Sequence, residues 1–160
     1  ELCAEALAPK YRAALRDALR ELRLAEVREG VWARPDNLDP DRSPATRDLA
    51  ARWCRTWRSA RPDPAPNASA LWDLDDWAAE AEELRAEMAA LIPDLEAGRS
   101  EALAPGFVTS ATVLRHFQHD PLLPPELLPA RWPGHALRED YDRYDAAYRA
   151  LLRGWLREDG

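Results

Sequence analysis

Two histidines and one aspartate form the group of side chains in this sequence whose spacing best suits metal chemistry. His116, His119 and Asp120 occur in the string HFQHD, and histidines three residues apart on a helix can share one metal ion. The alternative is structural: both histidines complement the negative end of a helix, and Asp120 before Pro121 caps the next helix. No second group of ligands completes a site, so the structural interpretation is favoured and no cofactor is predicted.

An acidic cluster has the composition of a general acid and base pair: Asp73, Asp75 and Asp76 in the string LWDLDDW. Its position at the start of an expected helix favours another role, because unpaired amide hydrogens and the helix dipole attract carboxylates there. Asp73 and Asp76 are three residues apart, as in a capping box, and are therefore predicted to cap that helix.

The motifs of enzyme active sites are missing from the sequence. It contains no GxSxG and no HExxH, and its scattered glycines match neither GxGxxG nor GxxxxGKS/T. Cys3 and Cys54 lie far apart and outside any CxxC pair, so thiols are favoured over a structural disulfide. We expect no enzymatic activity; the enzymatic alternative is a metal-dependent hydrolase that uses His116, His119 and Asp120.

The charge balance argues against DNA binding by this chain alone. Its 22 basic and 29 acidic residues give a net charge of −7, and the two signs are interleaved. DNA affinity needs clustered cations that neutralise many phosphates. No stretch approaches the ~20 apolar residues that span a bilayer, and the N-terminus lacks a secretion pattern, so a cytoplasmic location without membrane contact is predicted.

The first part of the chain combines helices with short strands. Apolar residues at helical spacing predict an amphipathic helix over residues 9–23, and a short hairpin is expected over residues 25–35. A helical turn followed by a strand is predicted within residues 43–58. The proline-rich residues 61–69 prevent regular structure and form the predicted domain boundary.

The second part is mostly helical. A continuous apolar stripe predicts a long helix over residues 73–98, and further helices are expected over residues 105–119 and 135–158. Between them, five prolines in residues 120–134 predict a packed but irregular segment, because leucines and a tryptophan accompany them. The last helix has two apolar edges, so one edge is available for a partner.

These elements define the expected fold class. The chain is predicted to be α+β, with a small antiparallel sheet unit in residues 1–66 followed by a mostly α-helical domain in residues 67–160. The predicted strands are few and their connections are short. Parallel pairing needs long crossover connections, so an antiparallel sheet is expected.

Three strings follow one another in this sequence: GVWARPDNL at residues 30–38, LWDLDDW at residues 71–77 and DPLLPPELLPARWPGHALR at residues 120–138. Taken together and in this order, they resemble the PaaX family, repressors of phenylacetic acid catabolism and their relatives. The last string is the most specific. The resemblance covers nearly the whole chain from about Tyr11 onward.

The resemblance implies a three-part protein: an N-terminal winged helix that binds DNA, a middle ferredoxin-like domain and a helical C-terminal domain. It also implies that a CoA thioester relieves repression. Residues 1–66 would then be the ferredoxin-like domain, shortened at its first strand, and the winged helix is expected to be absent from this chain. The resemblance also implies that the middle domain is similar to CRISPR-associated endoribonucleases. These nucleases use an acidic residue at the end of the first strand, and this residue has no clear equivalent here.

The leading hypothesis is therefore the effector-sensing and dimerisation part of a PaaX-type repressor, with a homodimer and an aryl- or acyl-CoA-like effector as expected partners. DNA would be bound only through the winged helix. The alternative is a stand-alone structural or protein-interaction module of the same fold. The residues expected to form the effector or interdomain motif are Trp32, Arg34, Trp72, Trp77, Arg131, Trp132 and Arg138.

Overall fold

The computed structural model describes residues 2–3, 9–58 and 67–158. The chain forms two units, Glu1–Asp73 with Pro121–Pro129, and Leu74–Asp120 with Ala130–Gly160. The chain therefore passes between the units three times. The boundary predicted from residues 61–69 lies largely outside the described residues, and the division between domains at residue 66 stays a prediction.

The first unit has the ferredoxin-like order of elements. Its sheet runs β2-β3-β1-β4 with every neighbouring pair antiparallel, and one helix follows β1 and another follows β3. The α+β prediction is confirmed, whereas the shortening of the first strand stays a prediction. The elements are β1 (Leu2–Cys3), α1 (Pro9–Glu21), β2 (Ala25–Arg28), β3 (Val31–Ala33), α2 (Pro44–Trp53) and β4 (Cys54–Arg55).

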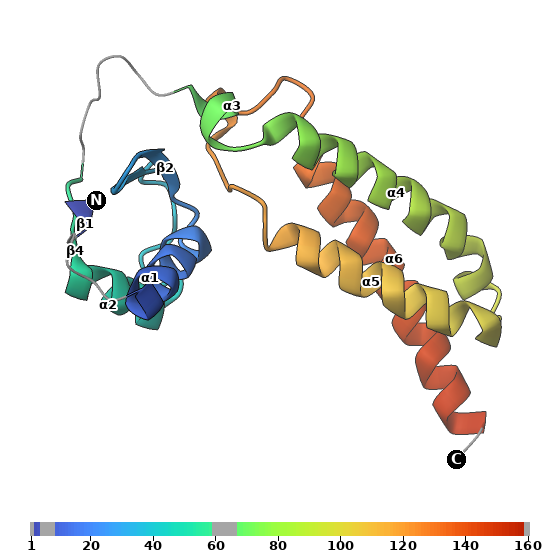
Figure 1. Ribbon diagram of the computed structural model, residues 1–160. Coiled ribbons are helices and arrows are strands. Elements are labelled where there is room, and N and C mark those ends of the chain that lie inside the picture. Colours follow the sequence, from blue (N-terminus) through green and yellow to red (C-terminus); the bar gives the residue numbers. More distant parts are fainter. Residues whose placement is uncertain (1, 4–8, 59–66, 159–160) are drawn as a thin grey trace. The chain divides into compact units, whose positions relative to one another are not determined.

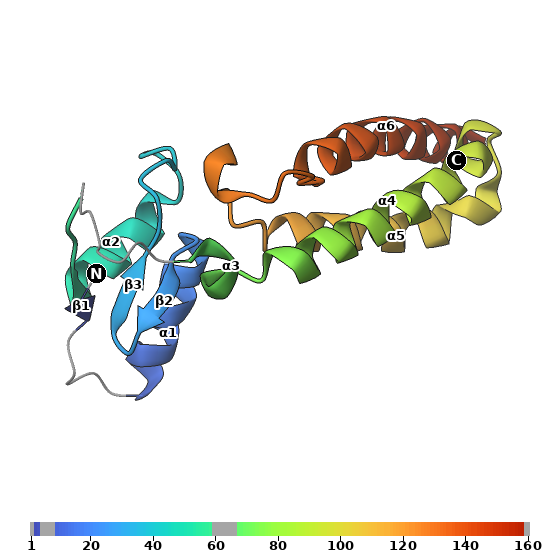
Figure 2. The same ribbon diagram turned by 90° about the horizontal axis from the view of Figure 1, so that it is seen from above.

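The core of this unit lies between its two helices and the sheet. Leu15 and Leu19 are four residues apart and share the buried face of α1, and Leu22, just after the end of the helix, belongs to the same cluster. They pack with Trp32 of β3 and Ala50 of α2. In Figure 1 both helices lie on one side of the strands, and Figure 2 shows the β2–β3 hairpin alongside α1.

Two local predictions in this unit need correction. A helical turn was expected before the last strand, whereas α2 is a helix of ten residues. Pro44 starts this helix and Ala50 anchors it in the core, so tertiary packing overrides the strand preference of Trp53. The strand that follows, β4, is only two residues long.

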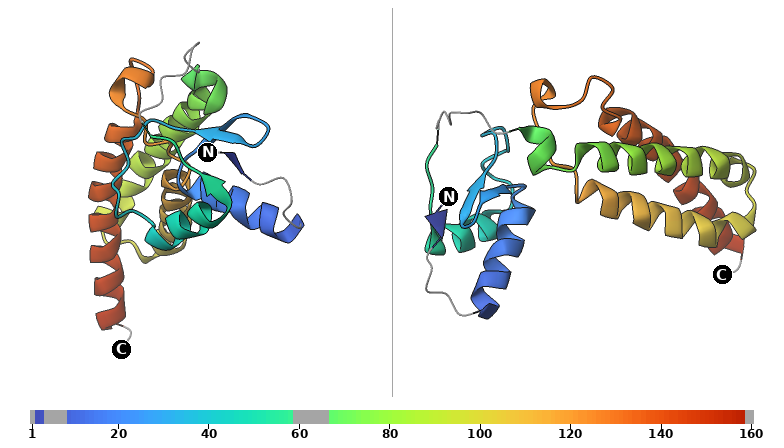
Figure 3. Two further views of the ribbon diagram at one scale, coloured as in Figure 1. Left: turned by 90° about the vertical axis from the view of Figure 1, so that its left-hand side faces the viewer. Right: turned by 45° about the horizontal axis from the view of Figure 1, so that its top comes forward.

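The second unit consists of three long helices that lie side by side (Figure 3). They are α4 (Leu74–Glu96), α5 (Leu103–Phe117) and α6 (Gly134–Glu158), with the 3-10 turn η1 (Ser100–Ala102) before α5. All three were predicted, although α5 begins and ends two residues earlier than expected. The segment between α5 and α6 is irregular, as predicted, apart from the 3-10 turn η2 (Pro125–Leu127).

The predicted apolar stripe of α4 forms the core of the helical unit. Ala81, Leu84 and Met88 are buried there, and the same cluster includes Val113 of α5 and Leu137 and Tyr144 of α6. The hydroxyl of Tyr144 donates a 2.8 Å hydrogen bond to the carbonyl of Gly106, so this buried polar group is satisfied. No helix in the described ranges is long and apolar enough to cross a membrane.

The predicted stop of α4 at Gly98 is confirmed. Gly98 has φ +75°, and the amide of Arg99 donates to the carbonyl of Asp94 while the amide of Gly98 donates to that of Leu95. This is the Schellman pattern, which favours glycine at the left-handed position.

Candidate functional site

Three aromatic rings stack at the start of the helical unit. Trp77 of α4 lies between His116 of α5 and Trp132, which precedes α6. The Trp77 and His116 ring centroids are 4.3 Å apart at 25°, and those of Trp77 and Trp132 are 4.4 Å apart at 16°. Two of the strings singled out in the sequence, LWDLDDW and the proline-rich string, therefore meet at this aromatic stack.

His116 is the titratable member of the aromatic stack. It is 3% exposed, and its Nδ1 lies 3.3 Å from a carboxylate oxygen of Glu80 on α4. Burial lowers the pKa of His116, because the charged ring loses its hydration, whereas the charge of Glu80 opposes that shift. Nε2 of His116 and Nε1 of Trp77 are buried without a hydrogen-bond partner among the described residues.

An ion pair lies next to the aromatic stack. Nη2 of Arg138 donates a 2.6 Å hydrogen bond to the buried carboxylate of Asp120, and Nη1 donates to the carbonyl of Gly134 at 2.7 Å. The guanidinium also lies over the ring of Phe117, 4.9 Å from its centroid. Arg138 thus joins the end of α5 to the start of α6.

The prediction that Asp120 caps a following helix is wrong. The chain after Asp120 continues without a helix through residues 121–124, and the next 3-10 turn has Pro124 at its N-cap position. A carboxylate with a neighbouring guanidinium gains a charge-assisted hydrogen bond, which is stronger than a neutral one. Asp120 is therefore the partner of Arg138.

Gly134 permits the close approach on which the stack depends. A Cβ at this position would lie 2.5 Å from Nε1 of Trp132 and 3.3 Å from Nη1 of Arg138. The first distance is too short for a real contact and the second is tight, so any side chain here would displace the Trp132 ring. This contact explains why glycine follows Trp132 and Pro133 in the sequence.

The ferredoxin-like unit contains a second polar cluster, which we call the Arg34 hub and which consists of Arg34, Asn37 and the backbone that they bind. Arg34 follows β3, and Nη1 donates to the carbonyl of Leu22 at 3.2 Å. Nη2 donates to Oδ1 of Asn37 at 2.7 Å and to the carbonyl of Leu122 at 3.1 Å. Nδ2 of Asn37 donates to the same Leu122 carbonyl at 2.9 Å.

The Arg34 hub therefore holds the irregular segment against the ferredoxin-like unit through backbone carbonyls. Leu122 has φ +51°, a left-handed conformation that is costly for leucine and persists where surrounding contacts fix it. Burial, followed by the nearby charge of Arg23, lowers the pKa of Arg34 to about 10, so the guanidinium stays protonated at neutral pH.

The turn after α1 supplies further acceptors to this region. Arg23 has φ +62°, and its carbonyl accepts a 3.3 Å hydrogen bond from Nε1 of Trp72. Nη1 of Arg34 lies 3.5 Å from the same oxygen. Two residues of the predicted motif, Arg34 and Trp72, thus converge on one turn.

The predicted motif residues separate into two groups. Trp32, Arg34 and Trp72 belong to the ferredoxin-like unit, where Trp32 is a core residue. Trp77, Trp132 and Arg138 lie together at the aromatic stack, whereas Arg131 is exposed. Their role as an effector or interdomain motif stays a prediction.

The acidic and histidine clusters take structural positions. Asp73 directly precedes α4 and Asp76 lies in its first turn, so their capping role stays a prediction. A ring nitrogen of His119 lies 2.9 Å from the carbonyl of Arg115 at the end of α5, while His116 is in the aromatic stack. Among the side chains that the structure describes, no three metal-ligating groups come together.

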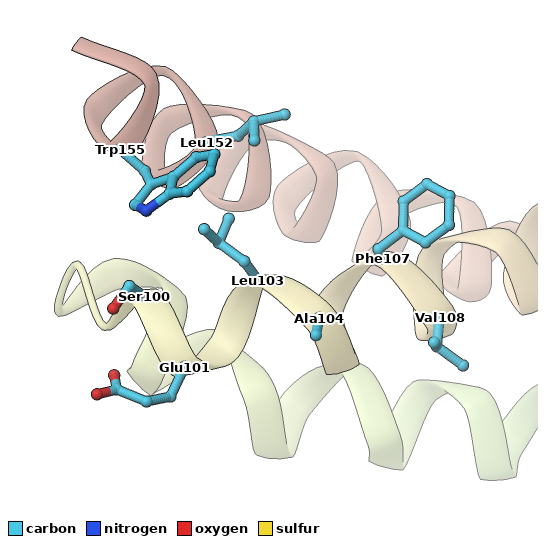
Figure 4. A pocket seen from close by; sticks show the side chains of 8 residues that line it. All are labelled: Ser100, Glu101, Leu103, Ala104, Phe107, Val108, Leu152 and Trp155. Atoms are coloured by element: carbon cyan, nitrogen blue, oxygen red, sulfur yellow. The ribbon is translucent and has the colours of Figure 1, made fainter. Parts of the chain in front are cut away.

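Sequence reasoning missed an apolar groove between α5 and α6. It is an open depression of about 780 Å³ (Figure 4). Phe107 is 64% exposed and Trp155 is 41% exposed, although both are large and apolar. The second apolar edge of the last helix was the only sequence pattern that pointed here. The lining residues are Ser100, Glu101, Leu103, Ala104, Phe107, Val108, Leu152 and Trp155.

The fold is that of an α+β protein with a helical C-terminal domain, and the aromatic stack lies within that helical domain. Residues 72–158 match the family model of the PaaX-like protein C-terminal domain, which is more than half of the chain. The chain belongs to the PaaX-like family, a family of regulators rather than of enzymes. The predicted family resemblance is confirmed.

A solved structure supports this assignment over nearly the whole chain. It is described as the uncharacterized protein Rv0674 from Mycobacterium tuberculosis, and it is 38% identical with a TM-score of 0.69. The match covers 95% of this chain and 61% of that protein's chain. No protein with a curated description matches.

Proposed function

We propose that this chain is the effector-sensing and dimerisation part of a PaaX-type bacterial transcription repressor that responds to an aryl- or acyl-CoA-like ligand. Membership of a regulator family supports the general role. DNA contact is assigned to a winged helix outside this chain, because the net charge of −7 does not suit phosphate binding.

The observation that carries the proposal is that side chains from the strings that resemble the PaaX family contact one another. Their aromatic and charged side chains bind one another: Trp77 and Trp132 stack, and Arg138 pairs with Asp120. A general acid or base must reach a substrate proton, whereas His116 is almost completely buried. Side chains that bind one another in this way hold segments of the chain together and are not available for a reaction.

Regulation would operate by a population shift. A ligand can move a conformational equilibrium only by as much as its affinities for the two states differ. The segment after Asp120 is bound by the Arg34 hub at Leu122, and Arg138 holds Asp120 itself. A ligand that loosens either attachment would change the path of this segment and, through it, the placement of the DNA-binding domains.

A thermal-shift experiment tests effector sensing. The chain is heated with a panel of aryl- and acyl-CoA thioesters, with CoA and the free acids as matched controls. At about 100 times its Kd, a ligand of the native state adds about 2.7 kcal/mol, which raises Tm by roughly 5 to 10 °C. If no thioester raises Tm by more than CoA does, effector sensing is contradicted.

The exposed face of α5 and α6 supports the homodimer in this proposal. Phe107, Val108, Trp155 and Leu156 expose apolar side chains at one end of the helical unit. Contiguous exposed apolar surface of this kind marks protein interfaces. A symmetric dimer would use the same face on both copies.

Sedimentation velocity tests the dimer. The chain is expected to sediment as a dimer that Phe107→Asp converts to monomer, because a charge replaces a mostly exposed ring in the proposed interface. Leu127→Asp is the matched control, since Leu127 is an exposed apolar residue of η2 outside this face. A wild-type monomer at every soluble concentration would contradict the proposal.

The same apolar face favours a second candidate function, a stand-alone interaction module without ligand sensing. The two experiments separate the candidates. Self-association without any thioester-dependent rise in Tm would support the interaction module over the effector-sensing one.

A further inference from the structure

The charge of the chain is divided unevenly along its length. Residues 9–58 contain 12 basic and 8 acidic residues, whereas residues 67–158 contain 9 basic and 17 acidic residues. The net charge of −7 therefore combines a positive range in the ferredoxin-like unit with a negative range in the helical part. A positive range attracts anions most strongly where its cations gather without acids between them.

Two segments of the ferredoxin-like unit contain cations and no acids. Residues 9–16 form the start of α1, and residues 49–58 run from the end of α2 through β4. Their basic residues are all exposed: Lys10, Arg12, Arg16, Arg52, Arg55 and Arg58. In the described part of the chain none of these arginines pairs with an acid, whereas five arginines of the helical unit do.

An aromatic contact joins the two segments. The ring centroids of Tyr11 in α1 and Trp53 in α2 are 6.1 Å apart at 30°, and the two residues are 47% and 38% exposed. Nζ of Lys10 lies 4.9 Å from the centroid of the Tyr11 ring. Arg12 follows Tyr11 in the chain, and Arg52 precedes Trp53. We call these five residues the basic aromatic surface.

We propose that the basic aromatic surface binds single-stranded nucleic acid. Cations neutralise phosphates of any sequence, and exposed rings stack on the faces of unpaired bases. A duplex would engage only the cations, because its bases stack on one another and their exposure costs energy. The inference goes beyond the proposed function, since it depends neither on the effector nor on the homodimer.

The same observations disfavour two other partners. An acidic protein would be held by charge and would not need the pair of exposed rings. A helix that lies on a membrane surface inserts an apolar face into the lipid. The apolar face of α1 is not available for this, because Leu15 and Leu19 are buried in the core of the unit.

Fluorescence anisotropy of labelled oligonucleotides with the whole chain tests the proposal. The probes are a 20-mer of deoxythymidine, a 20-mer of uridine and a mixed-sequence duplex of the same length, with polyglutamate as a competitor. Both single strands are expected to bind more tightly than the duplex, and the tighter of the two shows whether DNA or RNA is preferred. Contacts from three cations predict a slope of about −2 for log K against log salt, at about −0.7 per phosphate.

Two variants separate stacking from charge. Trp53→Ala is expected to weaken single-strand binding by roughly 5- to 150-fold, the range for one stacked base, and Trp53→Phe to recover most of the loss because it keeps a ring. Arg52→Glu, at an exposed position, should weaken binding and make the salt slope shallower by about 1. Arg153→Glu is the matched control, because Arg153 is exposed on α6 in the helical unit.

Circular dichroism establishes that each variant is folded, and Arg52→Glu remains informative if Trp53→Ala is not. Four results would overturn the proposal. They are no binding of either strand at 50 mM salt, duplex binding as tight as single-strand binding, displacement of the strand by an equal charge of polyglutamate, and unchanged affinity in folded Arg52→Glu.

Discussion

The aromatic stack and the Arg34 hub both use residues of the family strings, but they do so through different physics. In the helical unit, rings contact rings over their faces, and one ion pair between the buried Asp120 and the partly exposed Arg138 fixes the neighbouring turn. In the ferredoxin-like unit, one guanidinium and one amide bind backbone carbonyls. The stack depends on shape and apolar area, whereas the hub depends on satisfying polar groups.

This difference determines how each region should respond to substitution. Loss of a buried ring leaves a cavity whose cost grows with its volume. Loss of a donor leaves carbonyls without a partner, at a cost set by how far water can reach them. The following predictions compare these two kinds of loss.

The largest effect is expected from Trp77→Ala in the aromatic stack. Removing the central ring deprives both neighbours of a contact and leaves a large cavity, so the free energy of unfolding should fall by about 3 to 5 kcal/mol. Urea denaturation measures this loss. Trp57→Ala is the control, because Trp57 is 58% exposed and its loss should change stability by less than about 0.5 kcal/mol.

Arg34→Ala tests the hub and should be less costly. The carbonyls of Leu22 and Leu122 would lose their donor, which predicts a loss of about 2 to 4 kcal/mol in urea denaturation. Arg34→Lys keeps the charge but cannot reproduce the planar fork, so it should recover only part of the loss. Full recovery with lysine would show that charge alone holds the segment.

Gly134→Ala tests whether space beside Trp132 maintains the stack. The new Cβ would collide with Nε1 of Trp132, and overpacking of this kind should cost about 1 to 3 kcal/mol. Near-ultraviolet circular dichroism should also change, because the indole must move. Gly154→Ala is the matched control in the same helix, since a Cβ there meets nothing within 4 Å.

The smallest effect is expected from the titration of His116. Its pKa is lowered in the folded chain, so the unfolded chain binds more protons as the pH falls below about 6.5. Stability from neutral His116 is therefore fully present above this pH and is lost as the pH decreases. His116→Gln should remove this component, so the stability difference from wild type should shrink between pH 7 and pH 5.

Much of the fold could be predicted because hydrophobic periodicity is local. The stripe of α4 and its stop at Gly98 follow from spacing and from the backbone freedom of glycine. The length of α2 could not be predicted in this way, because its burial depends on contacts with α1 that are distant in sequence.

The partners of the site residues were harder to predict than their positions. The sequence identified Arg138 and Asp120 separately, but their pairing depends on the path of the chain between them. Likewise, the spacing of Cys3 and Cys54 gives no sign that strand register places them opposite each other. Local patterns indicate which residues matter, and tertiary structure decides what they bind.

A double-mutant cycle between Trp77 and Trp132 tests most directly whether the family strings form an internal scaffold. Trp77→Leu, Trp132→Leu and the double variant are compared by urea denaturation. We predict a coupling energy of about 0.5 to 1.5 kcal/mol, the range found for stacked aromatic pairs. Additive losses would mean that the two rings do not support each other, and would contradict the scaffold.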